Sequence, residues 1–349
     1  MGEVGSRMMR RTQKAGNGST NYQAGTIQIS GITYSEAREI ALDVFRANAL
    51  EFSQIARATA EERVIEITDA FFRELLEKCP DSLESIKDPA VQRAVFRVQE
   101  EYACSGDERL GQVLVDMLVD RCQSDDRGLK QITLNEAMKT APKLANNHFA
   151  ILSCLLFVAR TKFTGVGNID LLHERFLHIV APLATELRVS ESDLRHLQYA
   201  GCLSVDLMQS SFGEKLSRAY PGLYTRGFDE TEIKEPHRPY IMPCLRDKSK
   251  SQIAAVYDED LDPLLAADGV LDGHKAELKA MISFNLMPPR EVEEEISALH
   301  PNIRNLADLW NSTQMQSCQL TGVGIAIGHA NARRLLKEGF SAGIEVWVN

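Results

Sequence analysis

The stretch TGVGIAIGHANARR, residues 321–334, holds the residue types that could bind a phosphate. A glycine-rich turn that leads from a strand into a helix can hold an anion, because backbone amides point out of the helix N-terminus. A dinucleotide site also needs a parallel strand after the helix and an acidic residue about 20 positions further on. Here Glu345 lies among the last five residues, which counts against a dinucleotide site. The candidate residues of this turn are Thr321, Gly322, Gly324 and Gly328.

We favour close packing of a glycine-rich helix face as the role of this turn, because glycine lets backbones approach closely. A nucleotide-binding enzyme that uses residues 321–328 stays an alternative. The same stretch looks like the wing strand and following helix of winged-helix proteins, in which a strand ends in Leu-Thr-x-x-Gly. Residues 319–324 match that pattern, and helices expected at 290–299 and 303–311 stand where a helix-turn-helix would lie.

The helix expected at 303–311 is poor in side chains that read DNA. It carries only Arg304 for phosphates or base edges, and Asp308 offsets this charge. The whole chain has a net charge of −10, whereas binding to nucleic acid is driven by clustered Lys and Arg. We therefore favour a winged-helix-like fold used for protein contacts. A winged-helix DNA-binding regulator that contacts nucleic acid through Arg333 and Arg334 stays an alternative.

No other pattern identifies catalytic or metal chemistry. The eight histidines form no H-E-x-x-H or other metal spacing, and no P-loop or G-x-S-x-G motif is present. We assign no catalytic residue, no metal ligand and no cofactor. The seven scattered cysteines contain no C-x-x-C pair, which favours reduced core thiols in the cytoplasm. The longest apolar run, 149–159, is about half a membrane span, and no signal peptide is recognisable, so we expect no membrane partner.

Helical periodicity dominates the sequence up to about residue 220. Thr33 and Glu36 have the spacing of a capping box, which predicts a helix start. Residues 36–78 contain no Gly or Pro, which predicts one long helix of about 64 Å if it is unbroken. The charged stretch 57–66 would be a bend or a solvated face. The apolar seam along this helix needs cover from another surface.

The composition changes near residue 221, where prolines become frequent and helical signals become few. We expect a mixed C-terminal third with strands at 315–320 and 344–348. The predicted fold class is mainly α, with a short N-terminal β strip. The predicted organisation is a basic tail and β strip at 1–33, an α-helical domain at 34–220, an extended linker at 221–260 and a small α+β winged-helix-like domain at 261–349.

The polar strip at 17–30 alternates with period two, as a β-strand does. One interpretation is a disordered tail. The other is self-association, in which strips from several subunits pair edge to edge and bury Ile27 and Ile29, while the long helix packs against its copies. The candidate oligomerisation residues are Asn17, Ser19, Tyr22, Gln23, Ile27 and Ile29.

The segment GNGSTNYQAGTIQISGITYSEAREIALDVFRAN begins with Asn-x-Ser-Thr-Asn-x-Gln-Ala and enters a helix through Gly-Ile-Thr-Tyr-Ser. Together with Leu-Thr-x-Val-Gly-x-Ala-Ile at 320–327, it resembles an uncharacterised family of bacterial cytosolic proteins, from Asn17 to about Val348. This resemblance implies no activity. The strip also resembles openings that precede bacterial effector and sensor domains, some of them in phage-defence settings.

These observations lead to a hypothesis of function. We expect a cytoplasmic, non-enzymatic interaction protein that forms a homo-oligomer, binds a protein partner of unknown identity, and acts as a sensor or adaptor in bacterial phage defence.

Overall fold

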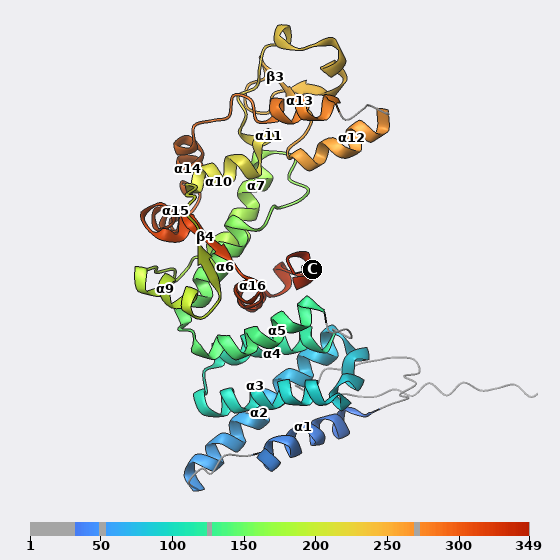
Figure 1. Cartoon of the computed structure of the whole chain (residues 1–349), viewed down its shortest axis with the longest axis vertical. Helices are drawn as coiled ribbons and strands as arrows, with labels where there is room; N and C mark the ends of the chain where they lie inside the picture. The colour runs from blue at the N-terminus through green and yellow to red at the C-terminus, as the bar shows by residue number, and fades with distance from the viewer. Residues whose placement is uncertain (1–31, 49–53, 124–127, 269–272, 349) are drawn as a thin grey trace, which may run out of the picture.

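The computed structural model describes residues 32–48, 54–123, 128–268 and 273–348, and this part of the chain is mostly helical (Figure 1). The mainly α fold class predicted from the sequence is confirmed. The first part of the chain forms α1 (Tyr34–Asn48), α2 (Gln54–Lys78), η1 (Pro80–Lys87), α3 (Pro89–Ser105), α4 (Glu108–Cys122), α5 (Leu129–Thr140), η2 (Ala141–Lys143) and α6 (Asn146–Ala159).

The second part of the chain has shorter elements. Two antiparallel pairs, β1 with β4 and β2 with β3, are the sheets of the described residues. The elements are α7 (Ile169–Arg175), η3 (Phe176–Val180), α8 (Ala181–Leu183), α9 (Glu191–Tyr199), β1 (Leu203–Val205), α10 (Phe212–Ala219), α11 (Pro221–Tyr224), η4 (Glu230–Glu232), η5 (Glu235–Tyr240), β2 (Ile241–Pro243), β3 (Ser251–Ile253), η6 (Asp258–Asp260), α12 (Leu261–Asp268), α13 (Gly273–Ile282), α14 (Pro289–Ser297), α15 (Pro301–Ser312), η7 (Gln314–Ser317), β4 (Cys318–Leu320), α16 (Gly322–Leu336), η8 (Lys337–Gly339) and η9 (Ile344–Val346).

The stretch expected to form one helix over 36–78 is divided into α1 and α2, which pack against each other in antiparallel directions (Figure 1). At the start of α1, the Tyr34 ring lies 5.7 Å from the Phe72 ring near the end of α2. At the end of α1, Phe45 packs in one apolar cluster with Val64 from the first half of α2. A straight helix through both segments is therefore excluded, and the long helix is α2 alone.

The hairpin of α1 and α2 covers its own apolar seam. Thr33 starts α1 through the predicted capping box: Thr33 N–H donates to Glu36 Oε2 at 2.8 Å, and Glu36 N–H donates to Thr33 Oγ1 at 3.3 Å. Ile67 and Phe71 on α2 are buried in the main core of the same chain. Because helices of one chain bury the described part of this seam, that apolar surface does not require a second copy.

Helix α16 lies between the N-terminal helices and the rest of the chain (Figure 1). It packs against α6 on one side and against α4 and α5 on the other. This central position suits its sequence, because Ala326, Ile327 and Ala330 are fully buried. Strand β4, which precedes α16, pairs with β1 in the register Leu203 with Leu320. The strand expected at 344–348 is wrong, since residues 344–346 form the 3₁₀ turn η9.

The described residues build one large core and one smaller one. The large core takes in α1 to α11 together with α14 to α16. The smaller core forms around β2, β3, α12 and α13, and residues such as Phe228, Tyr240 and Ile253 belong to it. Part of the expected linker at 221–260 is thus packed. The domain boundaries at 33, 220 and 260 stay a prediction.

A charged contact joins the smaller core to the large one. Arg246 donates through Nη1 and Nη2 to the two carboxylate oxygens of Glu295 on α14, at 2.6 and 3.1 Å. His173 Nε2 on α7 lies 3.0 Å from Glu295 Oε1. The Arg246 guanidinium also stacks 5.1 Å from the centroid of the Tyr224 ring. Glu295 therefore connects three segments that are distant in sequence.

Among the described helices, none combines the length and the apolar character that crossing a membrane requires.

Candidate functional site

Thr321, the first candidate residue of the glycine-rich turn, is the N-cap of α16. Its Oγ1 accepts a hydrogen bond from the Gly324 N–H at 3.2 Å and donates to the Gly201 carbonyl at 2.6 Å. The Thr321 hydroxyl thus accepts a backbone N–H bond at this helix end, where a bound anion would otherwise accept it. The turn sets where α16 begins.

The glycines of the turn lie where other chain segments approach closely. A Cβ atom on Gly324 would lie 2.0 Å from the Cys202 carbonyl oxygen, and one on Gly328 would lie 2.8 Å from the Leu152 carbonyl oxygen. A Cβ atom on Gly322 would approach Thr133 to 3.1 Å. These contacts account for glycine at positions 324 and 328 through packing against the residue before β1 and against α6, and they place Gly322 in tight contact with α5. Close packing of α16 in turn fixes the direction of its second half.

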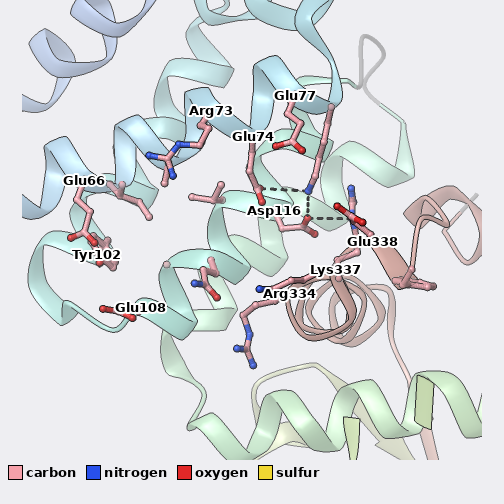
Figure 2. Close-up of a pocket in the computed structure, with 18 of the residues that line it drawn as sticks. Glu66, Arg73, Glu74, Glu77, Tyr102, Glu108, Asp116, Arg334, Lys337 and Glu338 are labelled. Carbon is pink, nitrogen blue, oxygen red and sulfur yellow. Dashed lines mark hydrogen bonds and ion pairs between the residues drawn. The ribbon is translucent and has the colours of Figure 1, made fainter. Parts of the chain in front are cut away.

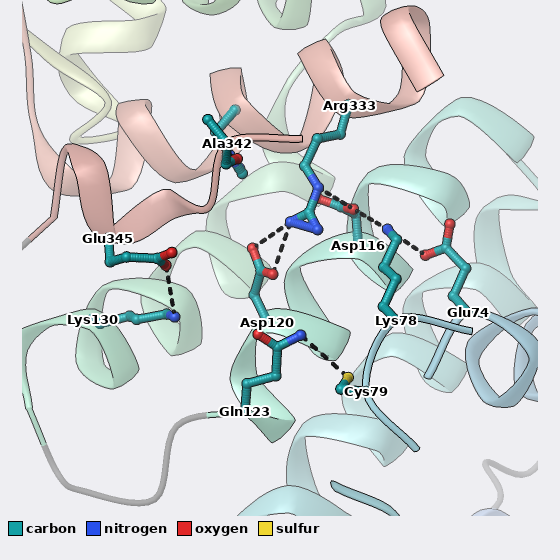
Figure 3. A network of polar contacts seen from close by, with 11 residues as sticks. Glu74, Lys78, Cys79, Asp116, Asp120, Gln123, Lys130, Arg333, Ala342 and Glu345 are labelled. Atoms are coloured by element: carbon teal, nitrogen blue, oxygen red, sulfur yellow. Dashed lines mark hydrogen bonds and ion pairs between the residues drawn. The ribbon is translucent and has the colours of Figure 1, made fainter. Parts of the chain in front are cut away.

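The second half of α16 carries Arg333 into a network of buried charges (Figure 3). Arg333 Nη1 lies 2.8 and 2.9 Å from the two carboxylate oxygens of Asp120 on α4. Arg333 Nε lies 3.2 Å from Asp116 Oδ1, one turn earlier on α4. Lys78 Nζ, at the end of α2, donates to the same Asp116 oxygen at 2.9 Å and lies 3.5 Å from Glu74 Oε2. Asp116 therefore links α2, α4 and α16.

Both aspartates of the network are almost completely buried, with exposed fractions of 3% for Asp116 and 4% for Asp120. A buried carboxylate without a partner costs several kcal/mol, so the two cations hold these charges in place. Burial raises the pKa of the Asp116 carboxyl, and Arg333 and Lys78 act in the opposite direction. Asp116 Oδ2 has no hydrogen-bond partner among the described residues.

The network also contains a possible set of metal ligands. Asp116, Asp120 and His329 each offer one ligand atom, and these atoms lie within 4.8 Å of one another. The Arg333 guanidinium, however, already contacts both carboxylates. His329 Nε2 lies 2.8 Å from the Ala342 carbonyl oxygen, and its Nδ1 has no hydrogen-bond partner among the described residues. A divalent ion would therefore have to compete with the Arg333 guanidinium, which already pairs with both carboxylates. We assign these residues to the packing of α16 against α4.

A cleft of about 910 Å³ opens beside this network, between α2, α4 and the C-terminal end of α16 (Figure 2). Asp116, Lys78 and Arg333 form part of its lining, and half of the other lining residues are charged. The residues that line the cleft are Glu66, Ile67, Ala70, Arg73, Glu74, Glu77, Lys78, Tyr102, Glu108, Gly111, Gln112, Val115, Asp116, Arg333, Arg334, Lys337, Glu338, Phe340 and Ser341.

Arg333 and Arg334, the predicted nucleic-acid contacts, both belong to this cleft. The Arg333 guanidinium forms buried ion pairs with Asp116 and Asp120. Arg334 is partly buried, and its Nε and Nη2 donate to Asn331 Oδ1 at 3.2 and 2.9 Å. Neither arginine lies on α15, the helix that the winged-helix pattern would use for recognition. A duplex that contacted both arginines would have to enter the cleft.

Polar side chains of α15 form hydrogen bonds with other segments of the same chain. Asn302 Nδ2 donates to the Ala181 carbonyl at 3.0 Å, and Asn305 Nδ2 donates to the Leu187 carbonyl at 3.1 Å. Arg304 is exposed. The amides that could read base edges are thus used to attach α15 to the segment around α8.

His148 and the buried cysteines Cys122 and Cys154 show structural roles. His148 accepts a hydrogen bond from the Ala145 N–H at Nδ1, while its Nε2 lies 3.1 Å from Asp193 Oδ1. All seven cysteines are free thiols. Burial raises the pKa of Cys122 and Cys154 to about 12, so these thiols stay protonated and poorly nucleophilic.

The oligomerisation residues predicted on the N-terminal strip lie outside the described residues. These are Asn17, Ser19, Tyr22, Gln23, Ile27 and Ile29.

The acidic side chains that line the cleft, Asp116 in particular, were not predicted from the sequence. One signal was present: Asp116 and Asp120 are spaced i, i+4 within the apolar run of α4, a face on which charged residues are rarely buried without a partner. The partner on α16 could not be identified, since 213 residues separate Arg333 from Asp120.

The fold and the cleft define a mainly α-helical protein that carries an open, charged cleft. Residues 31–348 match a family model described only as ":-like", and the chain belongs to this family. The matched range includes the cleft and the Leu320–Ile327 segment, whereas residues 17–30 precede it. The description specifies no activity, ligand or partner. No curated protein and no solved structure matches the chain.

Proposed function

We propose that this protein is a non-enzymatic, self-assembling interaction protein that acts as a sensor or adaptor in the cytoplasm. The observation that carries the proposal is the cleft between α2, α4 and α16, which is open and lined by charges of both signs. Such a surface is suited to recognising a partner, because complementary charges steer association and fix orientation.

The chemistry of the lining favours binding over catalysis. The described residues that line the cleft include no histidine and no cysteine, and its hydroxyl groups come from Tyr102 and Ser341. Nucleophilic catalysis needs a nucleophile within hydrogen-bonding reach of a base. Burial raises the pKa of Tyr102 to about 12, and Glu66 acts in the same direction through a hydrogen bond. This hydroxyl therefore stays protonated at neutral pH.

Self-assembly is assigned to the N-terminal strip. Since α1 and α2 cover their own apolar seam, packing of helices between copies is not needed, and edge-to-edge pairing of residues 17–30 is the remaining basis for a homo-oligomer. The resemblance of the strip to openings before bacterial effector and sensor domains supports a role in phage defence. The protein partner is the molecule that the cleft would recognise.

The experiment is a measurement of mass in solution by multi-angle light scattering. Full-length protein is compared with a variant that lacks residues 1–31. We expect the full chain to form an oligomer of defined mass and the shortened chain to be a monomer with unchanged helical content. Equal monomeric masses would exclude the assembly role of the strip.

A further inference from the structure

The cleft has two walls of opposite charge once its internal ion pairs are set aside. On the side of α2 to α4, Glu66, Glu77 and Glu108 outnumber Arg73. Of these, the side chains of Glu77, Glu108 and Arg73 form no hydrogen bond or ion pair within the described part of the chain, and the Glu66 side chain bonds to Tyr102. We call this side the acidic wall.

The opposite side is formed by the end of α16 and by η8, and we call it the basic wall. The Lys337 side chain makes no hydrogen bond or ion pair with the described residues, and among them the Arg334 side chain bonds only to Asn331 Oδ1. Of the described residues on this side, Glu338 is the single acid in the lining. Figure 2 shows Glu66 and Glu108 on one side, with Arg334 and Lys337 across from them. The two walls therefore offer opposite charges to anything that lies between them.

The dimensions of the cleft suit an elongated occupant. From Glu66 to Lys78 the lining follows α2 for about 18 Å, at about 1.5 Å per residue. An extended polypeptide covers this length with about five or six residues, at about 3.3 Å per residue. A strand-like segment also turns alternate side chains to opposite sides, as two facing walls require.

We propose that the cleft binds an extended segment of a partner polypeptide in which basic and acidic residues alternate. The basic side chains face Glu77 and Glu108 on the acidic wall, and the acidic side chains face Lys337 and Arg334 on the basic wall. This inference rests on the proposed function, because it specifies the partner of the same cleft. The contacts are exposed to solvent, so affinity falls as the salt concentration rises.

The test uses full-length protein and two dye-labelled hexapeptides of equal composition, followed by fluorescence anisotropy at low salt. One peptide alternates Lys and Glu, which places one sign of charge on each side of an extended chain. The other has three Lys followed by three Glu, which places both signs on both sides. We expect the alternating peptide to bind at least about fivefold more tightly, as two or three exposed ion pairs would give.

Variants of the walls show whether the peptide binds in the cleft. Glu77→Lys with Glu108→Lys, and separately Lys337→Glu, should each weaken binding of the alternating peptide by about threefold to tenfold. The matched controls are Glu174→Lys on α7 and Arg304→Glu on α15, which are exposed and do not line the cleft. They should leave binding unchanged. All these positions are exposed, so circular dichroism should show the same helical content.

Three outcomes would overturn the inference: equal affinity for both peptides, no binding of either peptide at millimolar concentration, or equal losses in the wall and control variants. Light scattering on the same preparations separates this inference from the proposed assembly. An oligomer that does not discriminate between the peptides refutes the cleft assignment alone. A monomer that binds the alternating peptide refutes the assembly role alone.

Discussion

Arg333 on α16 holds Asp120 on α4 through a single guanidinium nitrogen, which lies 2.8 and 2.9 Å from the two carboxylate oxygens. The two residues are 213 positions apart in the sequence. Their contact, together with the bond from Lys78 to Asp116, attaches the last long helix to the N-terminal helices. Lys78, Asp116 and Arg333, which line the cleft, thus also hold its two walls together.

Replacing Arg333 by methionine should destabilise the protein strongly. Asp116 would keep Lys78, but Asp120 would lose the two hydrogen bonds from Nη1 in a buried position. We expect a loss of about 3–5 kcal/mol in the free energy of unfolding, as is typical when one partner of a buried pair is removed. Urea unfolding followed by circular dichroism measures it. Arg304→Ala, at an exposed position, is the control and should change the free energy by less than about 0.5 kcal/mol. Equal effects of both variants would contradict the role of the network.

Gly324→Ala should be destabilising because the backbone just before β1 approaches this glycine closely. The new methyl group would lie 2.0 Å from the Cys202 carbonyl oxygen, which belongs to rigid backbone. We expect a loss of about 3 kcal/mol, at the upper end of overpacking penalties. Gly167→Ala is the matched control, since a methyl group there would meet no described atom within 4 Å, and it should stay within about 1 kcal/mol of the parent. Thermal and urea unfolding measure the stability of both variants. If Gly324→Ala is as stable as the parent, the turn has room beside Gly324 and close packing does not explain this glycine.

Local features of the fold could be predicted from the sequence. The capping box of Thr33 and Glu36 uses only neighbouring residues, and it is present as predicted. Mainly helical structure followed from the apolar periodicity. The hairpin of α1 and α2 was missed, because no Gly or Pro marks the reversal between them.

Long-range features could not be predicted. The pairing of β4 with β1 joins residues more than a hundred positions apart, and neither three-residue strand has a strong pattern of its own. The cleft depends on where α16 packs, and side chains such as Glu77 and Lys337 look like ordinary exposed charges in the sequence. Only the buried pair Asp116 and Asp120 gave a local sign that a cationic partner was required.

Glu295 should make stability depend on pH. Burial alone would raise its pKa, but hydrogen bonds from His173 and Arg246 lower the pKa to about 2, from an ordinary value of 4.5. A carboxyl whose pKa is lower in the folded state stabilises the protein above pH 4.5, and this contribution is lost as the pH falls toward 2. Glu295→Gln should therefore be less stable than the parent by about 1–2 kcal/mol at pH 6, after allowance for partial exposure.

The difference between Glu295→Gln and the parent should shrink as the pH falls. Urea unfolding at pH 6, 4.5 and 3.5 measures it. Glu294→Gln, at an exposed neighbouring position on α14, should show no such trend. A difference that stays constant or grows on acidification would contradict the assignment of this pKa to the contacts with His173 and Arg246.

The assembly hypothesis predicts that the two sides of the N-terminal strip respond differently to charge. In a period-two strand, Ile27 and Ile29 share one side and Gln28 lies on the other. Ile27→Lys with Ile29→Lys should place charges in the buried side of the paired strips and dissociate the oligomer, whereas Gln28→Lys adds a charge to the opposite side and should leave most of it intact. Light scattering over a range of protein concentrations measures the mass of each variant, and circular dichroism verifies that the helices are unchanged. If the double variant keeps the mass of the parent, or if Gln28→Lys dissociates the oligomer equally, the alternating side chains do not form the contact between copies.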